Sequence, residues 1–221
     1  LWPKNWRWVL VRSACLVAMW LAYYTALLVV PMATAAAGYY TIPILIAVLS
    51  AVVSSDRIGP QGWFGVTLGF LGVLLIVRPT LDGLNIYLFL PILAACLYAV
   101  AMVTTREKLS EESSVVLTFW VNVLFVIAGG WGVYLTDWQH IELRDAWALA
   151  AMALAAVIGT FAAAYAYQRG PSALIGTFDY GYLAFAILWG ILFVQEVPDL
   201  LAWCGIACIA CAGLLVIWRR T

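Results

Sequence analysis

The stretch that decides the fold is AWALAAMALAAVIGTFAAAYAY, residues 146–167, in which no side chain carries a charge. An α-helix rises about 1.5 Å per residue, so a run of this length crosses the roughly 30 Å of hydrocarbon in a bilayer. Similar apolar runs fill most of the chain and are separated by short polar turns. The sequence therefore predicts an all-α integral membrane protein, a polytopic bundle of eight transmembrane helices. We expect them at 8–30, 32–53, 62–77, 86–105, 115–135, 146–167, 172–194 and 200–218.

The composition excludes most soluble functions. Of 221 residues, 66% are hydrophobic and 10% are charged, whereas an ordinary soluble domain has about 25% charged residues. The net charge is zero and there is no basic tract, so we expect no nucleic acid as a partner. All five cysteines lie within apolar runs, and the single histidine, His140, is distant in sequence from Cys204, Cys208 and Cys211. We therefore expect neither a disulfide framework nor a metal site or other cofactor.

The basic side chains predict the orientation in the membrane. If each run crosses once, nine of the eleven Lys and Arg residues fall on the side where the chain begins, and Arg78 and Arg144 fall on the other. Because cytoplasmic loops carry the excess of basic residues, we expect both ends of the chain in the cytoplasm. The nine residues are Lys4, Arg7, Arg12, Arg57, Arg106, Lys108, Arg169, Arg219 and Arg220.

An internal repeat relates two parts of the chain. A shift of 140 residues places the first three runs on the last three without a gap and pairs residues of unusual types. Weak internal symmetry of this kind is typical of a duplicated fold. The pairs are Pro31 with Pro171, Tyr40 with Tyr180, Asp56 with Glu196, Trp63 with Trp203 and Gly65 with Gly205.

The repeat predicts how the parent protein is built. If the unit has five crossings, its two copies lie in the membrane in opposite senses, as in secondary transporters. Residues 1–80 are then the last three helices of a first unit, and residues 85–221 are a second unit of five. On this interpretation two helices precede residue 1 in the parent, which has ten helices in a 5+5 inverted repeat.

Several short motifs occur in an order similar to that of a known family. The first part contains YYTAL at 23–27, DR at 56–57 and GVLLIVRP at 72–79, and the second contains FDY at 178–180 and EVPD at 196–199. Together they resemble the EamA domain of the drug/metabolite transporter superfamily over essentially the whole chain. The resemblance implies a ten-helix transporter of small metabolites in the bacterial inner membrane, without fixing the substrate. The chain departs from the family pattern by lacking the first two helices and by having aspartate for the usual glutamate in DR and FDY.

Asp179 is the strongest candidate for a transport site. It lies about eight residues into the run 172–194, roughly 12 Å from the expected cytoplasmic end, and it is the one acidic residue placed so deep. A charged carboxylate at this depth is costly, so it must be protonated, partnered or exposed to a water-filled cavity. Two interpretations remain open. Asp179 is a substrate ligand or proton-coupling group, or it is a neutral acid that hydrogen-bonds a neighbour for packing.

Tyrosines at a similar depth are the next candidates. Tyr39 and Tyr40 shortly precede a proline, which leaves the Tyr39 carbonyl without its usual helical partner. A kinked helix with two phenols suits the wall of a cavity. Tyr182 comes three residues after Asp179 and shares its face, and Tyr180 matches Tyr40 in the repeat. The alternative role for each tyrosine is packing or anchoring at the membrane surface.

Asn122 and Tyr98 are weaker candidates on the runs 115–135 and 86–105. A buried amide needs a partner, so Asn122 either bonds another helix or contacts the solute. Small residues also recur every three or four positions in three runs, and we expect them to let helices approach closely. These stripes lie at 14–26, 62–72 and 151–163.

Secondary transport fits these features best: a small metabolite crosses the bilayer by alternating access between the two repeats, with proton coupling as one option. The alternatives are a channel or a structural membrane subunit without active transport, and an intramembrane enzyme. An enzyme needs a second deep carboxylate or a base near a nucleophile, and a channel is expected to have rings of like charge or a filter motif. The expected partners are a small-molecule metabolite and the lipid bilayer, and the sequence leaves a monomer and a homodimer open.

Overall fold

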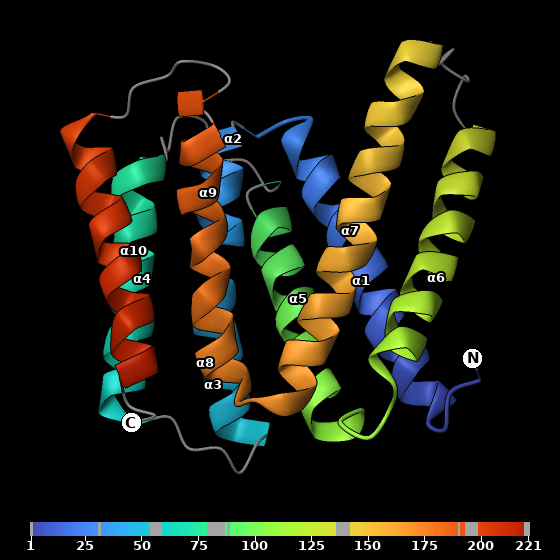
Figure 1. The fold of residues 1–221 in the computed structure, drawn as a ribbon, viewed down its shortest axis with the longest axis horizontal. Coiled ribbons are helices and arrows are strands. Elements are labelled where there is room, and N and C mark those ends of the chain that lie inside the picture. The colour runs from blue at the N-terminus through green and yellow to red at the C-terminus, as the bar shows by residue number, and fades with distance from the viewer. Residues whose placement is uncertain are drawn as a thin grey trace.

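The computed structural model describes residues 2–30, 32–53, 59–78, 87, 89–135, 142–189, 191–192 and 199–218. Within these ranges the chain is helical and contains no strand. The helices form columns that run between the two ends of a bundle (Figure 1). They are α1 (Trp6–Leu27), α2 (Met32–Tyr39), α3 (Ile42–Val53), α4 (Pro60–Val77), α5 (Phe89–Lys108), α6 (Ser114–Leu135), α7 (Leu143–Arg169), α8 (Ser172–Thr177), the 3₁₀ turn η2 (Phe178–Tyr180), α9 (Gly181–Trp189) and α10 (Leu200–Trp218).

The columns correspond to the eight expected spans, because α2 with α3, and α8 with η2 and α9, each form one interrupted column. Six helices of the described part are long and apolar enough to cross a membrane. Large side chains such as Leu28, Val126 and Tyr134 are exposed on the outside of the bundle, a surface that suits lipid and not water. The prediction of a polytopic all-α membrane bundle is confirmed.

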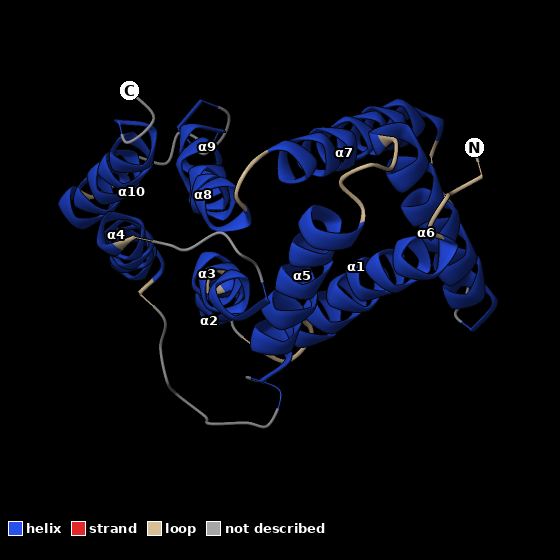
Figure 2. Ribbon diagram, turned by 90° about the horizontal axis from the view of Figure 1, so that it is seen from below, coloured by secondary structure: helices blue, strands red, loops and turns tan. Residues whose placement is uncertain are grey.

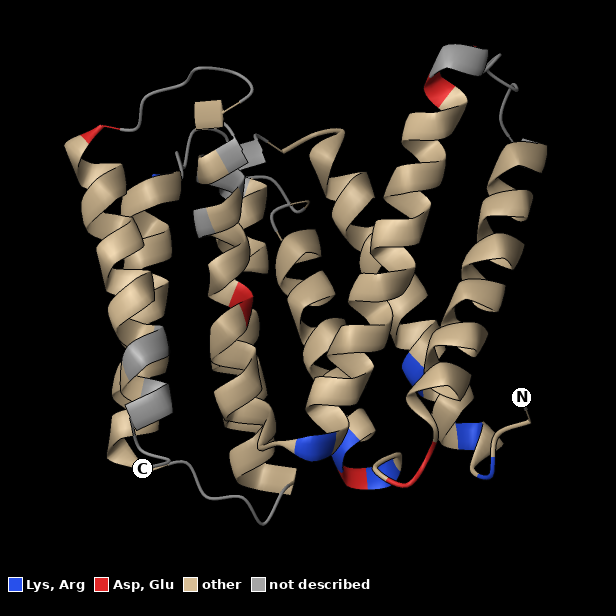
Figure 3. Cartoon of the chain, viewed as in Figure 1, with Lys and Arg blue, Asp and Glu red and all other residues tan. Residues whose placement is uncertain are grey.

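Basic side chains gather at one end of the bundle. α1 begins and α10 ends at this end (Figure 1), and Figure 3 shows most of the Lys and Arg residues of the described part there. Hydrogen bonds fix the turn between α5 and α6 at the same end. Gln168 Nε2 donates to the carbonyls of Leu109 and Glu112, and Ser114 Oγ donates to Gln168 Oε1. The end of α7 is thereby joined to the α5–α6 turn.

Glycines bring α4 and α10 into backbone contact. Gly62, Gly65, Gly69 and Gly72 are all buried in α4. A Cβ atom added to Gly72 would lie 2.7 Å from the carbonyl oxygen of Gly205, and one added to Gly205 would lie 2.6 Å from the carbonyl oxygen of Gly72. Helices associate through such close approaches where lipid offers no hydrophobic driving force. The expectation for the small residues at 62–72 is confirmed.

The other two stripes of small residues do not pack in this way. Ala14 and Ala18 of α1 are exposed, and α1 is buried through larger side chains such as Leu16 and Met19. A Cβ added to Gly159 of α7 would meet nothing within 4 Å, and the most apolar 18-residue stretch of α7 contains no buried residue. The expectation of close packing is therefore wrong for most of 14–26 and 151–163 in the described part, because this face of α7 lies at the outside of the bundle (Figure 2).

Two columns are interrupted at matching positions. α2 and α3 are separated by Tyr40 and Thr41, where the Thr41 hydroxyl donates to the Gly38 carbonyl at 2.7 Å. Pro43 in the first turn of α3 accounts for this break. The second break is η2, which contains no proline, so the expectation of one continuous helix over 172–194 is wrong. Under the shift of 140 residues Tyr40 falls on Tyr180, so the two breaks coincide in the repeat.

Helices paired by the shift run in opposite directions. α1 begins at the end of the bundle where α7 finishes, and α4 and α10 likewise run opposite ways (Figure 1). Three residues of the repeat pairs, Pro31, Asp56 and Glu196, lie outside the described residues. The division into units at 1–80 and 85–221 stays a prediction.

An ion pair joins α4 and α10 at the end opposite to the basic cluster. Arg78 follows α4 in the left-handed conformation, with φ of 44°, and its Nη2 donates to the two carboxylate oxygens of Asp199 at 2.7 and 2.6 Å. The hydrogen bonds from Arg78 and from the backbone N–H of Ala202 lower the pKa of Asp199 below its usual value. Both side chains of the pair are about half exposed, so its contribution to stability is sensitive to salt.

Candidate functional site

Asp179 lies at the break in the α8–α9 column. It is the middle residue of η2, two helical turns from the start of α8 at Ser172. Figure 3 shows an acidic position on this column between the two ends of the bundle. The side chain is half-buried, and its Oδ2 accepts a hydrogen bond from the hydroxyl of Tyr167 in α7 at 3.0 Å. The carboxylate is thus held between two columns of the bundle, away from both ends of its own column.

The hydrogen bond to Asp179 extends to a third helix. Tyr167 is 1% exposed, and its hydroxyl is also hydrogen-bonded to the side chain of Tyr98 in α5. Both tyrosines pack in the largest apolar cluster of the bundle, around Met102 and Ile46. A phenol both donates and accepts a hydrogen bond, so the three groups form a connected polar network inside apolar surroundings.

A cluster of tyrosine rings surrounds this network. The ring of Tyr39 lies 4.7 Å from that of Tyr23 and 6.3 Å from that of Tyr40, and the ring of Tyr40 lies 6.5 Å from that of Tyr182. The carboxylate of Asp179 is close enough to Tyr39 and Tyr40 to interact with their hydroxyls electrostatically. The structure thus brings together residues that the sequence placed on separate helices, 140 positions apart.

Tyr182 forms the open side of the cluster. Its side chain is 71% exposed, whereas Tyr40 is buried. The Tyr39 hydroxyl donates to the Met19 sulfur at 3.5 Å.

Tyr180 packs on α4, in one buried apolar cluster with Tyr40 and Val73. It is fully buried, and its hydroxyl donates to the Val66 carbonyl at 3.2 Å. A Cβ at Gly69 would overlap the Tyr180 ring, so the glycine makes room for it. Of the two interpretations made from the sequence, packing is the one that these contacts favour for Tyr180.

Asn122 lies on α6, outside the tyrosine cluster. Its Nδ2 donates to the Thr118 carbonyl one turn earlier in α6, at 2.8 Å. It lines an apolar groove of about 760 Å³ between α6 and α7, together with Phe119 and Phe161. The bond to Thr118 is within its own helix and uses one donor of the amide, so contact with a solute stays a prediction.

Arg12 is a functional candidate that the sequence reasoning counted only as a surface cation. It is 1% exposed, its Nε donates to Thr105 Oγ1 at 2.8 Å, and its Nη1 donates to the Leu117 carbonyl at 3.3 Å. It is also close enough to Tyr98 to interact electrostatically. A guanidinium buried without a carboxylate in direct contact in the described part is costly. The sequence does mark Arg12 as unusual, because it is the one charged residue inside the apolar run 8–30.

The bundle of long apolar helices defines a polytopic membrane protein. The model of the EamA-like transporter family matches residues 1–78 and 85–218, and the chain belongs to this family. The resemblance seen in the short motifs is thereby confirmed.

Individual relatives are transporters with different named solutes. The chain is 28% identical over 196 residues to a riboflavin transporter of Rhizobium johnstonii, covering 88% of this chain and 65% of that protein. It is 25% identical over 170 residues to a riboflavin transporter of Vibrio cholerae, covering 76% and 57%. It is 25% identical over 211 residues to the pseudopaline exporter CntI of Pseudomonas aeruginosa, covering 91% and 73%. The chain thus spans about two thirds of the length of these relatives.

A solved crystal structure shares the fold. It superposes with a TM-score of 0.84 at 19% sequence identity, over 98% of this chain and 78% of that chain. The family and these relatives are named as transporters.

Proposed function

We propose that the parent of this chain is a secondary transporter that carries a small metabolite across the bacterial inner membrane by alternating access, with Asp179 as its coupling or substrate-binding group. The observation that carries the proposal is the placement of Asp179 at a helix break, hydrogen-bonded to Tyr167 and beside the tyrosine cluster. Interrupted helices that carry polar groups at mid-membrane are typical of substrate and ion sites in transporters.

Two inverted repeats supply the alternating motion in this proposal. The matching helix breaks and the opposite directions of α1 and α7 support it. The exposed face of α7 agrees with two further helices in the parent. α1 packs against α5 and α6, so in an inverted repeat a second pair of helices packs on α7, whose most apolar stretch contains no buried residue.

The basic end of the bundle faces the cytoplasm in this proposal. Lys4, Arg7, Arg106, Lys108 and Arg169 all belong to helix ends or turns at that end. Since basic residues are retained on the cytoplasmic side, both ends of the chain lie in the cytoplasm, and the α6–α7 connection is outside.

The site suits a solute with an aromatic ring and a polar edge. Tyr182 offers an exposed ring for stacking, and Asp179 offers a hydrogen-bond acceptor or, when protonated, a donor. Riboflavin has this chemistry and appears in the names of two of the relatives above. It is therefore the first solute to assay.

The proposal is tested in proteoliposomes that contain the full-length parent. Riboflavin uptake, followed by its fluorescence, is measured with and without an imposed proton gradient, and then over a panel of metabolites. Asp179→Asn should keep expression and helix content but abolish uptake driven by the gradient. Glu111→Gln, an exposed acid in the α5–α6 turn, is the matched control and should transport normally. Wild-type flux and pH response in Asp179→Asn would assign the carboxylate to packing, and flux that never exceeds equilibrium for any solute would favour a channel.

A further inference from the structure

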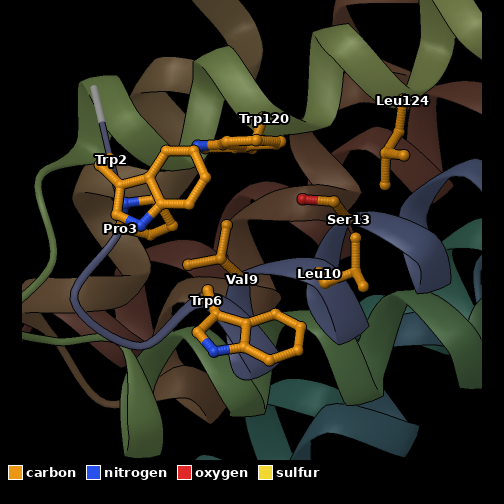
Figure 4. A pocket seen from close by; sticks show the side chains of 8 residues that line it. All are labelled: Trp2, Pro3, Trp6, Val9, Leu10, Ser13, Trp120 and Leu124. Atoms are coloured by element: carbon orange, nitrogen blue, oxygen red, sulfur yellow. The ribbon is translucent and has the colours of Figure 1, made fainter.

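A second site lies between α1 and α6 at the basic end of the bundle, and we propose that it binds an anionic phospholipid of the cytoplasmic leaflet. A cleft of about 330 Å³ is present there, between the N-terminal segment, α1 and α6. Figure 4 shows three indole rings and several aliphatic side chains around it. Its lining residues are Trp2, Pro3, Trp6, Val9, Leu10, Ser13, Trp120 and Leu124.

Specific side-chain and backbone contacts form the cleft. The ring of Trp2 contacts that of Trp120 edge to face at 6.0 Å, and the backbone N–H of Asn5 donates to Glu112 Oε1 at 2.7 Å. These two contacts hold the N-terminal segment against α6 and the α5–α6 turn. None of the lining residues belongs to the Asp179 cluster, so the cleft is separate from the proposed transport site.

Ser13 is the polar atom that this cleft leaves unsatisfied. Its Oγ is fully buried and has no hydrogen-bond partner in the described part of the chain. Figure 4 shows the hydroxyl pointing into the space between Trp120 and Val9. A buried hydroxyl without a partner is unfavourable, and the ester carbonyl of a lipid would accept its hydrogen.

Two exposed cations flank the cleft and select the headgroup. Lys4 follows Pro3 in the lining, and the guanidinium carbon of Arg7 lies 5.6 Å from the centroid of the Trp6 ring. In the described part neither cation forms an ion pair with an acidic side chain. The nearby Glu112 carboxylate is buried and already accepts the Asn5 N–H. Unpaired basic residues at the cytoplasmic surface attract anionic lipids.

The shape of the cleft suits an acyl chain and not a solute from water. Its volume is about eleven times the ~30 Å³ that one water molecule takes in the liquid, and its walls are almost wholly apolar. Leu10 and Trp6 are exposed, so the cleft opens toward the membrane phase at the level of the headgroups. A chain segment therefore enters between α1 and α6 while the phosphate reaches Lys4 and Arg7.

The test uses the purified chain with phosphatidylglycerol and phosphatidylcholine of identical acyl chains. Native mass spectrometry gives the ratio of the two bound lipids, and brominated phosphatidylglycerol reports tail insertion by quenching tryptophan fluorescence. Wild-type protein should prefer phosphatidylglycerol. Arg7→Gln should reduce the preference about fivefold, the factor that corresponds to about 1 kcal/mol per basic residue at an anionic surface. Arg169→Gln, which removes a cation of the same end away from the cleft, should change it less than twofold.

Variants that fill the cleft test whether a lipid acyl chain enters it. Ser13→Phe should remove the part of the bromine quenching that comes from Trp2, Trp6 and Trp120, whereas Leu21→Phe on an exposed part of α1 outside the cleft should not. If Ser13→Phe fails to fold, Leu10→Phe at the exposed rim gives the same test. Equal retention of both lipids, equal effects of Arg7→Gln and Arg169→Gln, unchanged quenching in the filled variants, or displacement of the lipid by riboflavin would each overturn the assignment. The result does not depend on whether the parent transports riboflavin.

Discussion

Replacing Gly72 by alanine is expected to push α4 and α10 apart. The added Cβ would lie 2.7 Å from the Gly205 carbonyl oxygen and 3.0 Å from Ile209 Cγ1, whereas ordinary contacts begin at 3.4 Å. A carbonyl oxygen in a helix cannot rotate away, so the two helices must separate by about 0.7 Å at the crossing, which is 3.4 minus 2.7 Å. A gap of this size forfeits a quarter to a half of the dispersion energy of the contacts that it opens.

Two opposing contributions determine how much Gly72→Ala changes the stability of the bundle. Overpacking of this kind typically costs ~1–3 kcal/mol, and alanine recovers up to ~1 kcal/mol of helix propensity relative to glycine. We therefore expect Gly72→Ala to destabilise the bundle by about 1–2 kcal/mol. Gly129 in α6 is the matched control, since it is exposed and a Cβ there would meet nothing within 4 Å. Gly129→Ala should be neutral or slightly stabilising.

Unfolding by sodium dodecyl sulfate in mixed micelles, followed by far-ultraviolet circular dichroism, measures the difference. Gly72→Ala should unfold at a lower detergent fraction than Gly129→Ala. Gly205→Ala should behave like Gly72→Ala, and the double variant should lose less than the sum, because both changes strain one contact. Identical midpoints for Gly72→Ala and Gly129→Ala would refute the reasoning.

Three further changes test other parts of the structure. Thr105→Val should destabilise the bundle by about 1–3 kcal/mol, since it leaves the buried Arg12 Nε–H without an acceptor; adding Arg12→Met should recover part of the loss in the same detergent titration. Asp199 has a lowered pKa in the folded state, so its ion pair stabilises the protein above the ordinary pKa of about 3.9 and is lost as the pH falls through the lowered value. The thermal midpoints of wild type and Asp199→Asn should therefore differ at neutral pH and converge below about pH 4. In a cysteine-free background, an impermeant maleimide should label Glu142→Cys in intact cells and spare Glu111→Cys.

Each of these has an outcome that contradicts it. A double variant of Arg12 and Thr105 that is less stable than Thr105→Val alone would mean that the guanidinium contributes more than its hydrogen bond to the hydroxyl. A stability gap for Asp199→Asn that persists in acid would show that the side chain acts by packing. Labelling at position 111 from outside would reverse the orientation.

Most of the fold is predictable from the sequence because lipid leaves the backbone few options. Apolar runs of about 20 residues must form helices when no water is present to satisfy the N–H and C=O groups. The break near Tyr40 was readable from Pro43. The break at Asp179 was not, because no residue type there forbids a helix. The 3₁₀ turn lies against α3 and α4 and accepts a hydrogen bond from Tyr167 of α7, contacts that the sequence does not reveal.

The sequence predicts which residues belong to the candidate site but not which hydrogen bonds they form. A carboxylate deep in an apolar run stands out in any sequence, which makes Asp179 a candidate from the sequence alone. Its partner Tyr167 lies at the end of an expected span, and one tyrosine among eleven carries no signal of its own. The burial of Arg12 is not predicted, because counting basic residues on each side of the membrane takes no account of how deep each one lies. Its burial depends on hydrogen-bond acceptors from α5 and α6, which residue spacing does not reveal.

The backbone contact between α4 and α10 determines where the bundle is stiff. At this crossing no side chain lies between Gly72 and Gly205, so no rotamer can absorb a change in the distance between the helices. The pair can rotate about the crossing, but it opens only by losing contacts along both helices. Amide hydrogens on both sides of these glycines should therefore be among the last to exchange with deuterium, while those at the two helix breaks exchange early. In the proposed alternating-access cycle we therefore expect this crossing to be the fixed axis and the bending to take place at Thr41 and Asp179.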